Sequence, residues 1–255
     1  MPLTVLTIPC LSDNYAFVLH NADTGATALV DAPEAAPILA ALDQRGWTLT
    51  DVVLTHHHHD HVQGLGPLRD RFSPRVIGAA ADAHRLPALD LEVSEGDMVT
   101  ICGETAHVYD VSGHTLGHIA LHFADSRAAY TADSLMALGC GRLFEGTPAQ
   151  MWDSLQKLRA LPDDTTIYSG HEYTAANAKF ALTIEPDNSD LILRVKRVTE
   201  ARANATPTVP STLAEEKATN PFLRADVAAL KMAVGMNDAE AADVFAHVRA
   251  AKDNF

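Results

Sequence analysis

The sequence of 255 residues predicts an α/β domain followed by a small, all-helical domain. Strand and helix patterns alternate as far as Gly170, whereas the apolar spacing from Thr174 onward is helical. In addition, histidine-rich or polar segments directly follow several predicted strands, and α/β folds build their sites there. We therefore divide the chain into residues 1–173 and residues 174–255.

Short apolar runs bounded by turn residues predict the strands of the first domain. They are Pro2–Ile8, Tyr15–His20, Ala26–Val30, Asp51–Thr55, Val76–Gly78, Val99–Cys102, Thr105–Val111, Ile119–Phe123, Ala128–Thr131 and Thr165–Ser169. One helix is expected over Pro33–Arg45, with Pro33 in its first turn and Gly46 just past its end. A second is expected to start at Thr147-Pro148, which caps it, and to run to about Ala160.

The second domain shows five helical patterns, over 174–185, 189–203, 211–218, 225–235 and 238–251. The segment Asn204–Ser211 contains two prolines and is expected to be an irregular loop.

Composition restricts the function classes. Hydrophobic residues make up 47% of the chain, enough for a full-sized core. Its three cysteines form no Cys-x-x-Cys pair, and no secretory or transmembrane pattern is present, so we expect a cytoplasmic monomer. The net charge of −14 disfavours nucleic acid and anionic membranes. Residues 175–255 are nearly neutral, with 10 basic and 11 acidic side chains, and are more compatible with a small anionic ligand.

The strongest functional signal is the segment Thr55–His61, Thr-His-His-His-His-Asp-His, at the end of a predicted strand. Alternate residues of an extended segment point the same way, so His56 and His58 can bind one metal ion. A turn after them would direct Asp60 and His61 toward a second ion, whereas His57 and His59 would point elsewhere.

Three later residues also follow predicted strands and could complete such a site, namely His114, Asp133 and His171. Each alone is more often a structural residue, but together they give seven ligands, too many for one ion and suited to two. We assign His56, His58 and His114 to one ion and Asp60, His61 and His171 to the other, with Asp133 bridging. Nitrogen and oxygen ligands permit zinc, iron or manganese; we expect zinc.

The motifs His-x-His-x-Asp-His and Gly-His-Thr-x-Gly-His resemble the metallo-β-lactamase superfamily, which implies an αββα sandwich. A narrower resemblance, to glyoxalase II, covers nearly the whole chain. It rests on five segments: Asp13-Asn14-Tyr15, Gly139–Gly146, Gly170–Thr174, Asn220–Arg224 and Arg249–Asp253. This resemblance implies hydrolysis of S-D-lactoylglutathione to D-lactate and glutathione, with the helical domain binding glutathione.

The resemblance also implies glutathione contacts from Arg142, Phe144, Tyr173, Arg249 and Lys252. Arg142 stands where the family often has lysine, and Phe144 where relatives have tyrosine, so one hydroxyl contact is missing. Without the resemblance, Arg249 and Lys252 would be interpreted as charges near a helix end.

The expected nucleophile is a metal-bridging hydroxide, because two divalent ions lower the pKa of a bridging water toward about 7. Asp133 would hold the ions together and Asp60 would orient the hydroxide. Asp31 could orient a ligand histidine. The alternative on the same fold is a glutathione persulfide dioxygenase with a single iron. A β-lactamase, a phosphodiesterase or a non-catalytic metal-binding module fits the sequence less well.

Overall fold

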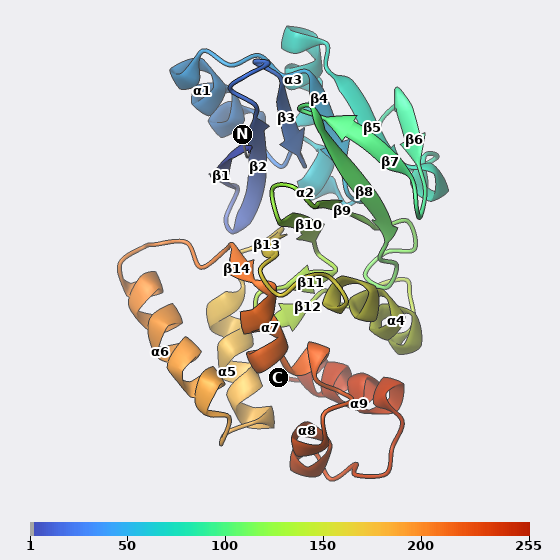
Figure 1. The fold of residues 1–255 in the computed structure, drawn as a ribbon, viewed down its shortest axis with the longest axis vertical. Coiled ribbons are helices and arrows are strands. Elements are labelled where there is room, and N and C mark those ends of the chain that lie inside the picture. The colour runs from blue at the N-terminus through green and yellow to red at the C-terminus, as the bar shows by residue number, and fades with distance from the viewer. Residues whose placement is uncertain (1–2) are drawn as a thin grey trace. The chain divides into compact units, whose positions relative to one another are not determined.

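The computed structural model describes residues 3–255 and contains two compact units (Figure 1). The first unit comprises the residues up to Asp110 together with Leu116–Thr131, and the second comprises Val111–Thr115 together with Ala132–Phe255. Pro2, the expected start of the first strand, lies outside the described residues. Within residues 3–255, no helix is both long and apolar enough to cross a membrane. The division at residue 173 stays a prediction.

The first sheet of the first unit has six strands in chain order. They are β1 (Thr4–Cys10), β2 (Asn14–His20), β3 (Thr27–Val30), β4 (Asp51–Leu54), β5 (Arg75–Ala79) and β6 (Leu91–Val93). β2 pairs antiparallel with both β1 and β3, and β3 to β6 are parallel. Because parallel strands end at the same sheet edge, the loops after β3 and β4 emerge side by side.

The second sheet contributes four antiparallel strands to this unit, in the order β10-β9-β8-β7. They are β7 (Met98–Ile101), β8 (Glu104–Asp110), β9 (Ile119–Phe123) and β10 (Ala128–Ala132). Every residue of β9 and β10 is buried, which agrees with their predominantly apolar sequence.

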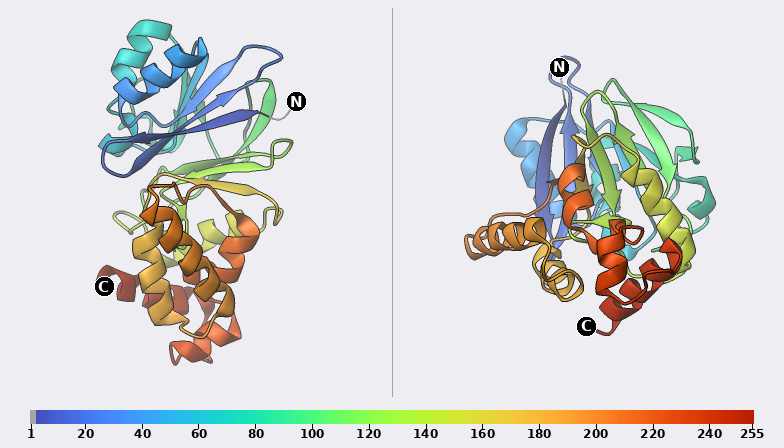
Figure 2. Two further views of the ribbon diagram at one scale, coloured as in Figure 1. Left: turned by 90° about the vertical axis from the view of Figure 1, so that its left-hand side faces the viewer. Right: turned by 60° about the horizontal axis from the view of Figure 1, so that its bottom comes forward.

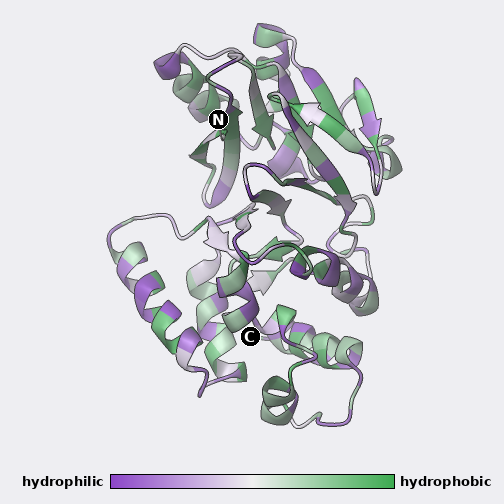
Figure 3. Cartoon of the chain, in the orientation of Figure 1, coloured by the Kyte–Doolittle hydropathy of each residue, from purple (hydrophilic) through white to green (hydrophobic). Residues whose placement is uncertain are grey.

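Helices α1 (Ala35–Arg45) and α3 (Leu65–Phe72) cover the outer face of the first sheet, and β7–β10 lie on its other side (Figure 2). Side chains of β2 pack on both faces of the sheet, because successive side chains of a strand point to opposite faces. Ala16 and Val18 belong to the core under the helices. Phe17 points the other way and lies 5.7 Å, between ring centroids, from Tyr130 on β10. Three layers of the expected sandwich therefore lie within this unit, and its strands are mostly hydrophobic (Figure 3).

The second unit is mainly helical. Its helices are α4 (Pro148–Arg159), α5 (Thr174–Ile184), α6 (Ser189–Ala203), α7 (Leu213–Thr219), the 3-10 turn η2 (Pro221–Leu223), α8 (Ala228–Ala233) and α9 (Ala241–Asp253). It also contains the short strands β11 (Leu135–Met136), β12 (Gly139–Cys140), β13 (Thr166–Ser169) and β14 (Ser211–Thr212). β11 pairs with β12, and β13 pairs with β14.

Aromatic residues form the centre of the second unit. Phe222 of η2 lies between Phe180 on α5 and Phe245 on α9, with ring centroids 6.0 and 5.9 Å away. Phe245 also contacts Trp152 on α4 at 6.0 Å. A smaller apolar cluster, around Leu138 and Leu191, joins β11–β12 to the helices α5 and α6. The hairpin therefore packs directly against the helical part of this unit.

Most predicted elements agree with the structure to within a few residues, but one detail of α1 was wrong and several short elements were missed, among them α3, β6, β11 and β12. Pro33 precedes the N-cap residue Glu34 and is not in the first turn of α1, although Gly46 does end that helix with φ 67°. The sequence pattern missed α3, because Gly66 and Pro67 read as helix breakers; Pro67 is tolerated in the first turn, where its missing N–H would have no intrahelical partner. Ser211–Thr212 forms a strand where only helices and a loop were expected.

Candidate metal centre

The first unit brings together four of the predicted ligands. His56 follows β4, whose last residue is Leu54, and Asp60 and His61 lie on the one-turn helix α2 (His59–Val62). The ring of His56 lies 4.8 Å from that of His58 and 4.2 Å from that of His61, measured between centroids. His56 and His61 are fully buried. The predicted cluster at the strand end is therefore present in the structure.

Asp31 orients His61. It follows β3 in the left-handed region, with φ 57°, and is buried. Its Oδ2 lies 2.8 Å from Nδ1 of His61, and it also accepts hydrogen bonds from the backbone N–H and the hydroxyl of Thr55, both at 2.9 Å. Since a carboxylate can only accept, Nδ1 of His61 donates, and Nε2 is the nitrogen that can bind a metal.

Other side chains fix the rest of this segment. Nδ1 of His56 lies 3.0 Å from the hydroxyl of Thr55, so Nε2 is again the nitrogen suited to coordination. Asn14 donates to Oδ2 of Asp60 at 2.9 Å. Sequence reasoning gave Asn14 no role of its own, and only its place in the Asp13-Asn14-Tyr15 motif marked it.

The two remaining histidines of the run point elsewhere, as predicted. Nδ1 of His57 lies 2.8 Å from Asp82, a buried carboxylate that also pairs with Arg85. His59 is exposed. His118, interpreted as structural, stacks on the ring of His56 at 4.6 Å.

The second unit brings together the other three predicted ligands. Oδ2 of Asp133 lies 3.5 Å from Nε2 of His114 and 3.2 Å from Nε2 of His171. All three are buried. Asp133 directly follows β10, and His171 comes two residues after β13. Asp133 therefore lies between two imidazoles, as a bridging ligand would.

The backbone of Gly141 and Arg142 packs closely against the His114 ring and holds it in place. Nδ1 of His114 lies 2.7 Å from the carbonyl oxygen of Arg142, to which it must donate. Gly141 makes this approach close, because a Cβ there would lie 2.0 Å from the carbonyl of Asp133 and 2.9 Å from Nδ1 of His114. Any other residue at position 141 would displace a predicted ligand.

The donor chemistry of both sets fits a divalent metal. Together they offer imidazole nitrogens and carboxylate oxygens, and three histidines have Nδ1 engaged by a neighbouring group, leaving Nε2 for coordination. Within the described residues, the groups of side chains that could hold a metal ion consist of histidine and aspartate and include no cysteine. The described residues thus support a metal site without thiolate.

The predicted glutathione contacts all lie in the second unit. Arg142 and Phe144 are exposed and follow β12; the Phe144 ring lies 5.3 Å from that of His114. Tyr173 stacks on His171 at 4.6 Å. The exposed side chains therefore lie next to two of the predicted ligands.

Arg249 and Lys252 occupy different environments near the end of α9. The Arg249 guanidinium is buried and donates to the carbonyl of Cys140 at 3.1 Å and to Asp253 at 3.0 Å. Lys252 lies over Phe180 and Phe255, and burial together with the charge of Arg249 lowers its pKa. Their role as substrate contacts stays a prediction.

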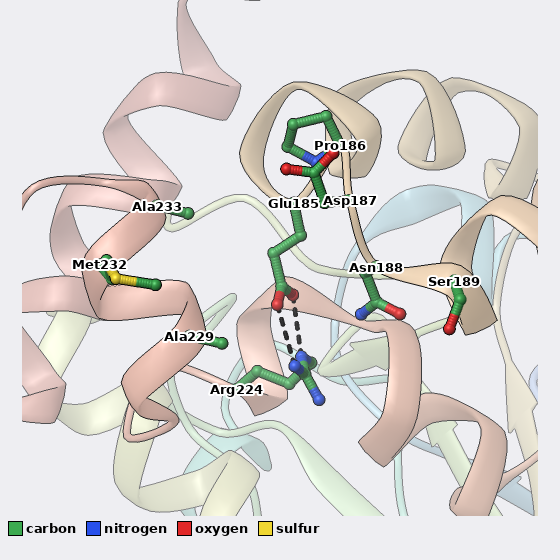
Figure 4. Close-up of a pocket in the computed structure, with 9 residues that line it drawn as sticks. All are labelled: Glu185, Pro186, Asp187, Asn188, Ser189, Arg224, Ala229, Met232 and Ala233. Atoms are coloured by element: carbon green, nitrogen blue, oxygen red, sulfur yellow. Dashed lines mark hydrogen bonds and ion pairs between the residues drawn. The ribbon is translucent and has the colours of Figure 1, made fainter.

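A separate pocket of about 400 Å³ lies between the α5–α6 connection and α8 (Figure 4). Glu185 and Arg224 form a two-bond ion pair at its base, at 2.8 and 2.9 Å. No predicted site residue lines it. Its lining carries the carboxylates of Glu185 and Asp187 and one guanidinium, that of Arg224, so its formal charge is negative and it is not the predicted anion site.

Comparison with known proteins agrees with this architecture. Residues 15–171 match the family model of the metallo-beta-lactamase superfamily. The solved structure of ETHE1 from Myxococcus xanthus is 25% identical, with a TM-score of 0.70 over 98% of this chain and 90% of that one. The BLEG-1 B3 metallo-beta-lactamase has a TM-score of 0.67 over 86% of this chain and 99% of that one, at 21% identity. Fold and donor set thus define a metallo-β-lactamase-type metalloprotein, as predicted.

The rest of the chain narrows this class. Residues 172–255 match the family model of the hydroxyacylglutathione hydrolase C-terminus. Hydroxyacylglutathione hydrolases from Ruegeria pomeroyi and from Cereibacter sphaeroides strain ATCC 17025 are 63% and 64% identical, and each match covers 100% of both chains. The chain belongs to the hydroxyacylglutathione hydrolases, the glyoxalase II family, and the resemblance predicted from its motifs is confirmed.

Proposed function

We propose that this chain hydrolyses S-(2-hydroxyacyl)glutathione thioesters, chiefly S-D-lactoylglutathione, to a 2-hydroxy acid and glutathione. The observation that carries the proposal is the placement of Arg142, Phe144 and Tyr173 beside His114 and His171 in one unit. A substrate that contacts the first group, Arg142, Phe144 and Tyr173, would have its thioester bond next to the two predicted metal ligands. Water adds its oxygen to the acyl carbon, the carbon–sulfur bond breaks, and glutathione leaves as the thiolate, which takes up a proton.

Two zinc ions per chain complete the proposed site. His56, His58 and His114 would hold one ion, Asp60, His61 and His171 the other, and Asp133 both. When bound, such ions make hydroxide available near neutral pH and stabilise negative charge on a carbonyl oxygen. The fixed Nδ1 contacts of His56, His61 and His114 support this assignment, because each of them presents Nε2.

Asp60 and Asp133 have distinct proposed roles. Asp60 is anchored by Asn14, which donates to its Oδ2. From this position it can accept a hydrogen bond from the attacking water and orient it. Asp133, between His114 and His171, keeps the two imidazoles at a fixed separation. The thiolate leaving group has a conjugate acid with a pKa of about 8.5, so a strong general acid is unnecessary.

We assign glutathione binding to cationic and aromatic side chains of the second unit. Arg142 offers an exposed guanidinium whose Nε lies 3.7 Å from Asp253, and Lys252 adds a second positive charge. Phe144 and Tyr173 offer exposed aromatic surface. The contact of Arg249 with a substrate carboxylate is proposed from the family resemblance alone, because its guanidinium is buried and donates to the carbonyl of Cys140 and to Asp253.

The test is cleavage of S-D-lactoylglutathione by the purified protein, with metal content measured on the same sample. We expect glutathione release with about two metals per chain. His171→Asn should lose metal and activity, whereas His122→Asn, which changes a buried histidine outside both ligand sets, should keep them. No release in any condition would refute the proposal. Oxygen uptake on glutathione persulfide with one iron would favour the dioxygenase, which the hydrolase relatives do not support.

We also propose that the protein is a monomer in the cytoplasm. All three cysteines are buried and free, which supports a reducing compartment. Light scattering on the purified protein tests the monomer, and fractionation of the source cells tests the compartment.

A further inference from the structure

The hairpin Leu135–Cys140 connects the predicted ligand Asp133 to Arg142, whose carbonyl orients His114. It contains only two short strands, and Leu138 in its turn has φ 57°, a left-handed conformation that is unfavourable for a leucine. Such a turn persists when surrounding groups hold it. The groups that hold it therefore influence both predicted ligands.

Side chains from the helical part of the same unit bind the backbone of this hairpin. Asn220 donates to the carbonyls of Met136 and Gly139, at 3.1 and 2.9 Å. Glu216 on α7 accepts the N–H of Leu138 at 2.9 Å. Asn177 and Arg249 donate to two further hairpin carbonyls, those of Ala137 and Cys140, each at 3.1 Å.

Asn220 and Glu216 are themselves fixed. Both are fully buried, and Asn220 donates to Oε2 of Glu216 at 3.1 Å. Arg194 on α6 pairs with Oε1 of Glu216, which also accepts from Ser211 at 2.6 Å. A buried carboxylate with this many donors has one stable orientation. The hairpin is thus held by a rigid polar network, which we call the clamp: Arg194, Glu216 and Asn220.

We propose that Asn220 and Glu216 are positioning residues for the metal centre, acting through the hairpin on Asp133 and His114. The proposal rests on the proposed function for the identity of the ligands. In the structure, the hairpin closes where the N–H of Gly141 donates to the carbonyl of Ser134 at 3.2 Å, next to Asp133. A hairpin that shifts moves this closure and, with it, the carbonyl of Arg142 that fixes the His114 ring.

The test compares Asn220→Ala with Asn188→Ala. Asn188 makes a similar set of bonds in the same unit, to the carbonyl of Ala218 and to the N–H groups of Asp190 and Leu191, but none to the hairpin. Zinc affinity is measured by chelator competition, alongside kcat, KM and thermal unfolding. Because residues behind the ligands typically change metal affinity by about 10–100-fold, we expect Asn220→Ala to lower zinc affinity and kcat by about tenfold. Asn188→Ala should stay within about twofold, and thermal unfolding gives the loss of stability in each variant.

Equal zinc affinity and kcat in the two variants would overturn the proposal. A higher KM with unchanged zinc affinity would also overturn it, since the hairpin would then act on substrate alone. If Asn220→Ala does not fold, Glu216→Gln keeps the shape of the clamp and should shift zinc affinity in the same direction by a smaller factor. Zinc affinity is independent of the reaction, so an inactive wild-type protein would refute the proposed function and still leave the clamp testable.

Discussion

Asp31→Asn isolates the part that one buried carboxylate plays at the metal centre. Asparagine tolerates the left-handed backbone at this position, and its oxygen can still accept the N–H of Thr55. The amide nitrogen would then face Nδ1 of His61, where Oδ2 now lies at 2.8 Å. Two donors cannot share this contact, so His61 must move its proton to Nε2, the nitrogen that should bind metal.

The magnitude follows from this tautomer change. Loss of a partner behind a ligand histidine costs about 10–100-fold in metal affinity, which corresponds to about 1.4–2.7 kcal/mol. Chelator competition with zinc measures it, and circular dichroism checks the fold. Asp51→Asn is the matched control, because Asp51 is a buried aspartate on β4 whose partner, Arg75 at 2.7 Å, lies outside the ligand set.

Asp31→Asn with wild-type zinc affinity would refute the reasoning. An equal loss of zinc affinity in Asp51→Asn would show that any lost buried carboxylate in this sheet weakens the site, and the tautomer argument would fail in that case too.

Three further predictions concern the second unit. Phe144→Tyr restores a hydroxyl at an exposed position and should lower KM by about 2–10-fold, the effect of one hydrogen bond, with kcat unchanged; an unchanged KM would show that no substrate group reaches this ring. Burial and the charge of Arg249 lower the pKa of Lys252, so its charge is lost at a lower pH than that of an ordinary lysine, and KM should rise as the pH rises through this pKa. Lys252→Arg should delay this rise, and identical pH profiles would exclude Lys252 from binding. Burial raises the pKa of Cys140 from 9.0 to about 11. Between these two pH values the folded state keeps the neutral thiol, whereas the unfolded state ionises. The neutral thiol's contribution to the free energy of unfolding is therefore complete below pH 9 and is lost toward pH 11 at about 1.4 kcal/mol per pH unit. Denaturant unfolding should show a shallower alkaline loss in Cys140→Ala than in the wild type.

The strands and the first ligand set were predictable because they depend on local pattern. The alternation along the histidine run separates His56 and His58 from His57 and His59, and the structure follows it. The end of α1 at Gly46 and the cap at Thr147, with a capping box to Gln150, were also readable from single residues. In such cases the neighbours along the chain decide the conformation.

What could not be predicted depends on partners distant in sequence. Arg249 reads as an exposed charge near a helix end, yet it is buried and donates to the carbonyl of Cys140, 109 positions earlier. Glu216 looks like a surface residue of an amphipathic helix, but its carboxylate faces Arg194 and Leu138. No periodicity marks such residues, since their environment comes from tertiary structure alone.

The clamp binds the hairpin through peptide groups and not through its side chains. Positions such as Met136 and Ala137 can therefore drift in evolution without changing how the loop is held, provided that their backbone remains the same. The groups that hold the hairpin are instead a few polar side chains of the C-terminal third. Exchanging that third between distant relatives would also exchange the clamp that holds the hairpin. We therefore expect residues 15–171 and residues 172–255, which match two different family models, to evolve together.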